Sequence, residues 1–375
     1  MRISVQHVST KDGYHLWSET YDRELADIFA IQDEIAQSIA RALSPRLAPG
    51  RLVEPSTNNL EAYRLWLQGR QAALRYTPEA VARARACFAG AVARDSQFAL
   101  PHLAMAELLY DAAHVGLVPS AEAAAQAKEA VRTALARDDS LGEAHALLGA
   151  LLGVFEYDWA GAERAFDRAL RLNPSSSTVL ERHAWHRLVS RQRMQEAIDQ
   201  IRRATIRDPL SARVHMRFGL IWIAARQYGR AADECRTALE IAPGLRLTHW
   251  FLGYALMMSG DEDEGLAECR KLYKQGGLSP LIVGGMCTLY GILGREKDAR
   301  RMFEELSKLS RTARVPPLAF AWAFLGLHDE RVFEWLEKAI DARDPAVTQL
   351  PVMPIYDGIR DDPRFQKLLA KMGLA

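Results

Sequence analysis

Residues 162–175 read AERAFDRALRLNPS, and this stretch decides which fold the sequence predicts. Small residues at Ala162 and Ala169 flank the bulky Phe166 at helical spacing, and Pro174 follows them. Proline cannot continue the hydrogen-bond ladder of a helix, so it marks where this helix ends. The same spacing recurs twice downstream: Ala197, Ile201, Ala204 and Pro209, and then Ala231, Cys235, Ala238 and Pro243.

A second helix is predicted upstream of each of these stretches. It carries a large residue next to a small one, which gives room where two helices cross closely. Its copies are His145, Leu148 and Gly149; Leu180, His183 and Ala184; His215, Phe218 and Gly219; and His249, Leu252 and Gly253. The closing prolines of successive units stand 35 and 34 residues apart. The chain therefore repeats a two-helix unit of about 34 residues.

This repeat resembles the tetratricopeptide (TPR) family, whose units are helix–turn–helix pairs of that length. Weaker copies in both directions extend the pattern to about eight units over residues 58–345. The resemblance implies an all-α fold, a TPR solenoid wound into a right-handed superhelix. Such a solenoid is stabilised by contacts between neighbouring units rather than by one central core.

The N-terminal end does not repeat. Residues 2–8 and 15–21 alternate like two strands, and the Asp12–Gly13 pair between them is typical of a hairpin turn. A short helix is expected next, from apolar residues at helical spacing: Ile28, Ile31, Ile35, Ile39 and Leu43. The strand edges of such a hairpin invite pairing with another chain, so homo-oligomerisation through it is expected. Light scattering with and without residues 1–45 tests this expectation.

Two stretches carry a second resemblance: GYHLWSETYDRELADIFAIQDEIAQSIARAL at residues 13–43 and RDDPRFQKLLAKMGL at residues 360–374. Together with the repeats they resemble the TPR regions of bacterial class III adenylate cyclases and winged-helix transcriptional regulators, in which a TolB-like α/β domain precedes the array. The resemblance implies a remnant of a TolB-like domain at residues 1–45, a linker at 46–57, the repeats at 58–345 and a C-terminal capping segment at 346–375.

Composition excludes several classes of protein. With 48 Lys and Arg against 47 Asp and Glu, the net charge is +1, so no direct nucleic-acid partner is expected. The uncharged stretch between Lys274 and Arg295 opens with glycines and Pro280, which predicts a loop and a short buried helix rather than a membrane span. The four cysteines form no CxxC pair, and the first 17 residues lack an apolar signal core, so we expect a cytoplasmic protein.

Catalytic motifs are not found in the sequence. There is no P-loop, GxGxxG, HExxH or nucleophile elbow. His145, His215 and His249 share one repeat position and are expected to pack between paired helices. His183 and His186 could face one ion, but no third ligand is near them in sequence. Asp341 and Asp344 have no visible acid–base partner, so we expect neither an enzyme nor a cofactor or metal.

The resemblance also implies a binding surface, because TPR proteins usually bind through the concave face lined by the first helix of each unit. Reading that face by repeat phase predicts a groove rich in aromatic and Met side chains, suited to a helix or an extended apolar peptide. The predicted protein-binding residues are Trp185, Met216, Leu220, Trp250, Tyr254, Met257 and Met258. Burial inside a tightly wound superhelix, or against the N-terminal helix, explains the same residues equally well, so both interpretations stay open.

Three functions follow for comparison with the structure. The leading one is a non-catalytic protein–protein interaction scaffold or sensor module of a bacterial signalling or regulatory protein. The alternative is the regulatory C-terminal part of an adenylate cyclase, or of a winged-helix transcriptional regulator, whose output domain lies outside this chain. In the winged-helix case, the basic recognition helix that binds DNA would lie in that output domain.

Overall fold

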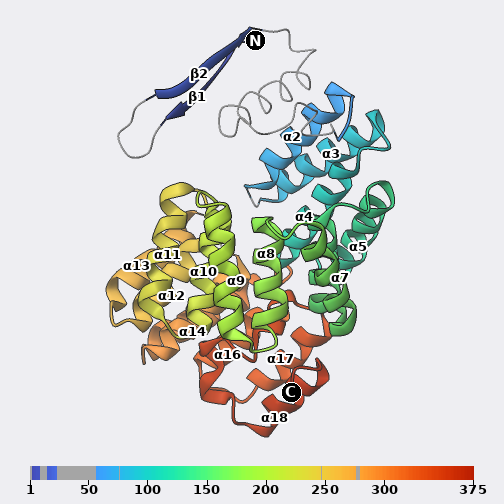
Figure 1. Ribbon diagram of the computed structural model, residues 1–375. Helices are drawn as coiled ribbons and strands as arrows, with labels where there is room; N and C mark the ends of the chain where they lie inside the picture. Colours follow the sequence, from blue (N-terminus) through green and yellow to red (C-terminus); the bar gives the residue numbers. More distant parts are fainter. Residues whose placement is uncertain (1, 9–14, 23–55, 76, 246, 276–278) are drawn as a thin grey trace.

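The computed structural model describes residues 2–8, 15–22, 56–75, 77–245, 247–275 and 279–375 (Figure 1). Within them, residues 60–341 form eight helix–turn–helix pairs. The pairs are α2 (Leu60–Ala73) with α3 (Pro78–Arg94), α4 (Ala99–His114) with α5 (Ser120–Arg137), α6 (Gly142–Leu151) with α7 (Trp159–Leu172), α8 (Ser177–His183) with α9 (Met194–Arg207), α10 (Ala212–Ala224) with α11 (Tyr228–Ile241), α12 (Leu247–Met258) with α13 (Glu262–Gln275), α14 (Pro280–Ile292) with α15 (Glu296–Leu309), and α16 (Pro317–Gly326) with α17 (Val332–Asp341). Two π-helical turns, η2 (Leu152–Glu156) and η3 (Ala184–Val189), extend α6 and α8.

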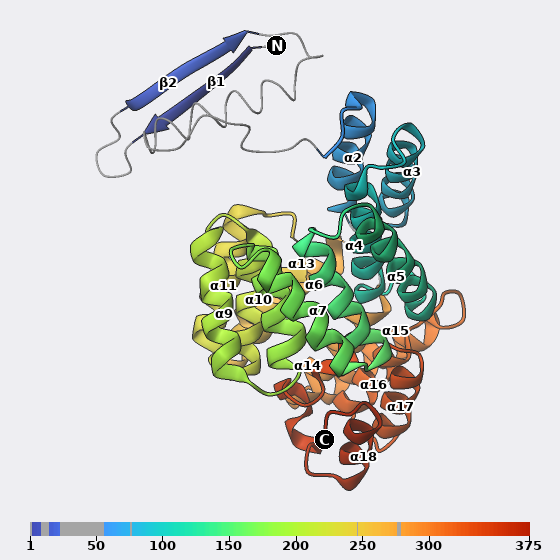
Figure 2. The same cartoon turned by 45° about the vertical axis from the view of Figure 1, so that its right-hand side comes forward.

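The pairs stack in chain order along a strongly curved path, as the colour gradient in Figures 1 and 2 shows. First helices of successive pairs touch each other, α6 with α8 and α10 with α12. After α17 the chain forms η4 (Pro345–Gln349), η5 (Pro354–Ile359) and α18 (Pro363–Lys371). The protein is a TPR-like helical solenoid, and among the described helices none is long and apolar enough to cross a membrane.

Paired helices cross closely at small residues of the first helix. A β-carbon added to Gly149 would lie 2.9 Å from the Phe166 ring, and one added to Gly253 would lie 2.4 Å from Cys269 Sγ. Contacts that short do not occur between real side chains, so the crossing distance requires glycine. Each of these contacts joins a small residue of the first helix to a larger residue of the second. Small and bulky residues at this spacing are the pattern from which the sequence predicts each unit.

The turn inside each pair uses a left-handed residue in the second to eighth units. Tyr157, Gln192, Arg226 and His328 have φ between 52° and 59°, and glycine occupies the same place at Gly116, Gly260 and Gly294. Backbone amides after this residue close back onto the first helix; Gln227 N, for example, donates to Trp222 O at 2.9 Å. This Schellman-type ending fixes where the turn residue projects, and at Arg226 it places a guanidinium at the end of α10.

The uncharged stretch before Arg295 contains α14, which is almost entirely buried. Gly284 and Gly291 pack directly onto the backbone of α16: a β-carbon on Gly291 would lie 2.0 Å from Gly326 O. Thr288 Oγ1 donates to Trp322 O at 2.6 Å across the same contact. A short apolar helix is thus covered by protein on its glycine-rich face.

Residues 2–22 contain two strands, β1 (Arg2–Val8) and β2 (His15–Asp22), which pair antiparallel with Ile3 opposite Tyr21. Ser4 Oγ and Thr20 Oγ1 are 3.0 Å apart across the pair. The predicted turn at residues 9–14, the helix over residues 28–43 and all but the end of the linker lie outside the described residues. The predicted combination of hairpin and helix, and an oligomer contact through it, therefore stay predictions.

We expect Gly253→Ala to destabilise the protein by about 1–3 kcal/mol, because the added methyl group would displace Cys269 and the Gly265 carbonyl. Gly229→Ala is the matched control: it also lies in a helix, but nothing approaches within 4 Å of the new methyl group. Alanine at position 229 should stabilise the protein slightly, by about 0.5–1 kcal/mol. Urea unfolding followed by circular dichroism gives both values, and equal effects at the two positions would contradict the role of the close crossing.

Candidate functional site

The seven residues predicted to line a groove lie mostly inside the solenoid. Five are buried, at no more than 9% exposure: Trp185, Met216, Leu220, Tyr254 and Met257. Trp250 and Met258 are half-buried. Trp185, Leu220, Tyr254 and Met257 belong to one apolar cluster that extends from α8 to α16, and the half-buried Trp250 and Met258 pack against it. The structure therefore brings six of the seven together, four of them as core, and of the seven only Trp250 and Met258 offer surface to a partner.

Part of this burial comes from contact between units. The Trp250 ring packs on α14 so tightly that a β-carbon on Gly285 would lie 2.4 Å from its Cη2 atom. Residues of the C-terminal part of the chain also pack on this apolar cluster. Val352 is buried in the same apolar cluster, and Met353 and Ile355 pack against it. Burial inside the superhelix, one of the two interpretations that the sequence left open, thus describes most of the seven residues. Binding by Trp250 and Met258 stays a prediction.

A group of charged side chains lies on the inner face, supplied by α4, α8 and α10. We call it the inner polar cluster. Its ion pairs join Glu107, Asp111 and Glu181 to Arg182, Arg213 and Arg217. The shortest are Arg217 Nε to Glu181 Oε1 at 2.6 Å and Arg182 Nη2 to Glu107 Oε1 at 2.7 Å. The cluster ties the second, fourth and fifth units together.

Glu181 is the centre of this cluster and is only 1% exposed. Burial alone would raise the pKa of its carboxyl, but the guanidinium groups of Arg217, Arg213 and Arg182 outweigh it and the pKa is lowered. Arg217 also lies over the Trp185 ring, 5.0 Å from its centre. Glu181 is therefore a charged group held inside the solenoid by three cations.

Neutral polar groups complete the inner polar cluster. Tyr110 Oη lies 2.8 Å from His186 Nε2, and His114 Nδ1 lies 2.9 Å from Tyr110 O. Burial lowers the pKa of His114 to about 3 and that of His186 well below its usual value, so both rings stay neutral near pH 7. Three arginines face three carboxylates, so the cluster balances its own charge. It suits a structural brace better than an anion site.

Two sets of contacts return the C-terminal end to the middle of the solenoid. Trp159 Nε1 donates to Met372 O at 2.7 Å, and Arg191 Nη1 donates to Gly373 O at 2.9 Å. Tyr157 Oη donates to Ile340 O at 3.2 Å. These contacts join residues about 180 to 210 positions apart, so the curved stack of pairs is closed by its own end.

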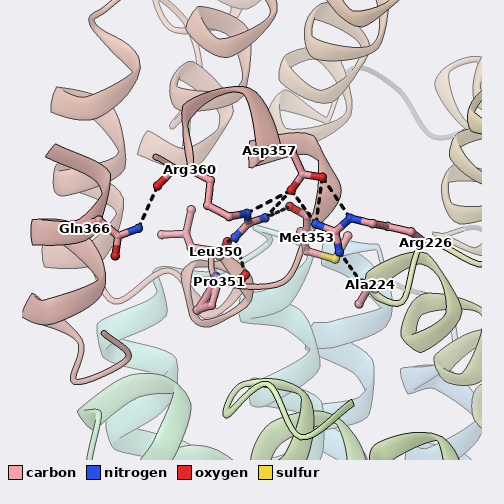
Figure 3. Close-up of polar contacts among 8 residues, drawn as sticks. All are labelled: Ala224, Arg226, Leu350, Pro351, Met353, Asp357, Arg360 and Gln366. Atoms are coloured by element: carbon pink, nitrogen blue, oxygen red, sulfur yellow. Dashed lines mark hydrogen bonds and ion pairs between the residues drawn. The ribbon is translucent and has the colours of Figure 1, made fainter. Parts of the chain in front are cut away.

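The second set involves residues 350–360, which we call the C-terminal loop (Figure 3). Asp357 receives Arg226 Nη2 at 2.7 Å and Arg360 Nη2 at 2.7 Å. Arg360 also donates to the carbonyl oxygens of Leu350 at 3.1 Å and Met353 at 2.9 Å, and to that of Pro351. Arg360 thus holds the loop together from within, and Arg226 connects it to the end of α10.

Two of the three histidines of the shared repeat position connect paired helices, whereas His145 Nε2 lies 3.1 Å from Asp139 O, just before its own helix. His215 Nδ1 lies 2.7 Å from Glu234 Oε2, and His249 Nδ1 lies 2.8 Å from Glu268 Oε2. His183 instead lines a cavity of about 270 Å³ between α7 and α9, beside Glu163, Asp167 and Arg187. In the part of the chain that the structure describes, no three His, Cys, Asp or Glu side chains come together as metal ligands.

The residues predicted to bind a partner included none of the six charged members of the inner polar cluster, among them Glu107 and Asp111 on α4. Glu107 and Asp111 stand four residues apart, and so do Tyr110 and His114. This spacing indicates that the members of each pair lie on the same face of the helix. Arg226 and Asp357 were also missed. A turn arginine and a loop aspartate are ordinary surface residues in sequence, and only the return of the C-terminal end brings them together.

Comparison with known proteins supports the fold. No protein-family model matches the chain. IFIT1, solved as a monomeric mutant with m7Gppp-AAAA, superposes on 93% of this chain and 79% of its own at a TM-score of 0.59 and 14% identity. YrrB, described as a TPR protein with an unusual peptide-binding site, matches 50% of this chain and 91% of its own at a TM-score of 0.31 and 19% identity. The likeness to IFIT1 shows the helical solenoid fold.

A curated relative matches by sequence over a short part. "Putative adenylate cyclase 3" of Rhizobium meliloti (strain 1021) is 42% identical over 79 residues, 20% of this chain. The match spans 14% of the length of that protein.

We expect Glu181→Gln to lower the free energy of unfolding by about 3–5 kcal/mol, because Arg217 and Arg213 would remain inside without their carboxylate. Glu61→Gln is the matched control. It breaks an exposed ion pair with Arg64 on α2 and should leave stability nearly unchanged. Denaturant unfolding of the two variants gives the comparison, and a mild effect of Glu181→Gln would mean that the cluster does not brace the stack.

A pH-dependent prediction concerns Asp344, which is buried just before η4 and accepts a hydrogen bond from Ala346 N at 3.1 Å. Burial raises its pKa from 3.8 to about 6. A raised acid pKa means that the folded state prefers the protonated form, so this group destabilises the fold increasingly as pH rises from about 4 to above 6.

Asp344→Asn keeps the accepting oxygen and removes the charge. The variant should be more stable than the wild-type protein above pH 7, by up to about 3 kcal/mol, since one pKa unit corresponds to about 1.4 kcal/mol. The difference should vanish near pH 4. Thermal unfolding of both proteins across this pH range measures it, and a constant difference would mean that the carboxyl does not titrate as described.

Proposed function

We propose that this chain is a non-catalytic protein–protein interaction scaffold, the regulatory module of a bacterial signalling protein that works in the cytoplasm. The observation that carries the proposal is the solenoid of eight stacked pairs, whose first helices present a continuous inner face. Stacked repeats provide long curved surfaces, and repeat proteins use such surfaces to bind other proteins. The charge-balanced inner polar cluster supports a protein rather than a nucleic acid as partner.

Within that face we propose that an apolar peptide or helix docks along α12, around Trp250 near its start and Met258 at its end. These two predicted residues keep part of their surface exposed. Aromatic and Met side chains offer large, adaptable contact area to an apolar segment. The buried members of the set then act by holding the inner face in shape rather than by touching the partner.

The identity of 42% to a putative adenylate cyclase over 79 residues supports the second candidate function. On this proposal the chain is the regulatory part of a cyclase and its partner is an output domain. The TolB-like remnant at residues 1–45 would then join the two, and a winged-helix output domain is the other member of this class. Binding of the chain to a separately produced cyclase domain distinguishes this candidate from a free-standing scaffold.

A photo-crosslinking amino acid at Met258 tests the docking proposal on the full chain in bacterial cells. We expect one defined partner to be cross-linked from this position. No such partner should be cross-linked from Arg270, an exposed matched position on α13. Trp250→Ala should lower the yield about tenfold while the helical circular dichroism is kept. Equal cross-linking from both positions, or an unchanged yield in Trp250→Ala, would contradict docking at this place.

A further inference from the structure

We propose that a groove between α3 and α4 binds a medium-chain carboxylic acid, that is, an alkyl chain of about ten carbon atoms with a carboxylate head. None of the residues that line this groove belongs to the set predicted to bind a protein. The inference therefore goes beyond the proposed function, because it gives the scaffold a small-molecule ligand at a place apart from its protein partner.

The first argument is the size and chemistry of the groove, which is a cavity of about 360 Å³. Side chains from both helices line it: Phe88, Ala89, Val92 and Ala93 from α3, and Pro101, His102 and Met105 from α4. All of these residues except His102 are apolar, so the groove favours a ligand that removes apolar surface from water. At roughly 30 Å³ for each water-sized group, the cavity holds about ten to twelve carbon atoms.

The second argument is that two hydrogen bonds between α5 and the first unit bracket the groove. Arg85 Nη2 donates to Gln126 Oε1 at 3.0 Å, and Arg137 Nε donates to Ser96 O at 2.9 Å. The groove residues of α3 lie between positions 85 and 96, so α5 is held to the first unit on both sides of them. Ala89 is exposed, so the groove opens to solvent along its length. A groove that is fixed at both ends and open at the side suits an extended chain.

The third argument is a positive charge at one end of the groove. Its bond to Ser96 O places the Arg137 guanidinium at the turn between α3 and α4, next to the start of α4. Among the residues that the structure describes, no carboxylate lies within ion-pair distance of Arg137, and the side chain is exposed. Its Nη groups can therefore donate to the carboxylate of a ligand.

His102 supplies a second polar contact at the same end, because it lies in the first turn of α4. Its Nε2 atom is buried and has no hydrogen-bond partner within the described part of the chain. Burial, and to a smaller extent the Arg137 guanidinium, lowers the pKa of His102, so the ring is neutral near pH 7. A neutral ring with its proton on Nε2 donates to a carboxylate oxygen. Because a buried polar atom without a partner is costly, a ligand that pairs with it gains affinity.

The test is calorimetric titration of the full chain with decanoate at pH 7.5, below the concentration at which decanoate forms micelles. We expect one binding site per chain. Hexanoate has four fewer methylene groups to bury and should bind about tenfold more weakly or worse. Decylamine carries the same chain with a cationic head, which Arg137 repels, so it should also bind about tenfold more weakly.

Two variants locate the site, and each has a matched control. Ala89→Trp fills the open side of the groove and should lower decanoate affinity about tenfold or more, whereas Ala82→Trp, at an exposed position of α3 outside the groove, should not. Arg137→Gln removes the charge and should lower decanoate affinity about tenfold without weakening decylamine. Arg132→Gln, an exposed arginine of the same helix, should leave both affinities unchanged. Circular dichroism checks that each variant keeps its helices.

The groove proposal is overturned if decanoate does not bind, or if Ala89→Trp and Ala82→Trp bind it equally well. Equal affinities for decanoate and decylamine, or an unchanged decanoate affinity in Arg137→Gln, would overturn the carboxylate head. Cross-linking from Met258 in cells does not depend on this groove. A partner captured there without decanoate binding leaves the scaffold function standing, and decanoate binding without a captured partner leaves the groove standing.

Discussion

The close crossing of two helices at a small residue is the constraint on which the rest of the structure depends. Where Gly253 meets Cys269 and Gly149 meets Phe166, no larger residue fits between the helices. The short distance sets the thickness of each pair and so the angle at which the next pair stacks. Over eight pairs these angles accumulate into a curve tight enough for Trp159 to reach Met372. Local packing thereby determines the global closure of the molecule.

Closure changes what the inner face can do. In an open solenoid the side chains of the first helices face solvent, whereas here Trp185, Tyr254 and Met257 are core. The inner face is shared between a charged brace around Glu181 and an apolar part covered by the C-terminal loop.

Sequence periodicity predicted the helix pairs because each depends on residues within about 34 positions. The small residue, the bulky residue and the closing proline of the unit around Phe166 all act on their neighbours. The burial of Tyr254 could not be predicted in this way. The apolar cluster that contains it also takes in Val352, about 100 positions later, and repeat phase gives the direction of a side chain but not which distant residues join its cluster. For the same reason Arg226 and Asp357 were missed, since both resemble ordinary surface residues until the chain end returns.

The two ion-pair systems of the inner face differ in burial, and this difference assigns their roles. Breaking the pair of Glu181 with Arg217 leaves a charge inside the protein, so that contact holds the curvature and resists change. Breaking the pair of Asp357 with Arg226 returns both groups to water at little cost. The buried pair therefore fixes the packing of α8 against α10, whereas the exposed pair adds little to the stability of the fold.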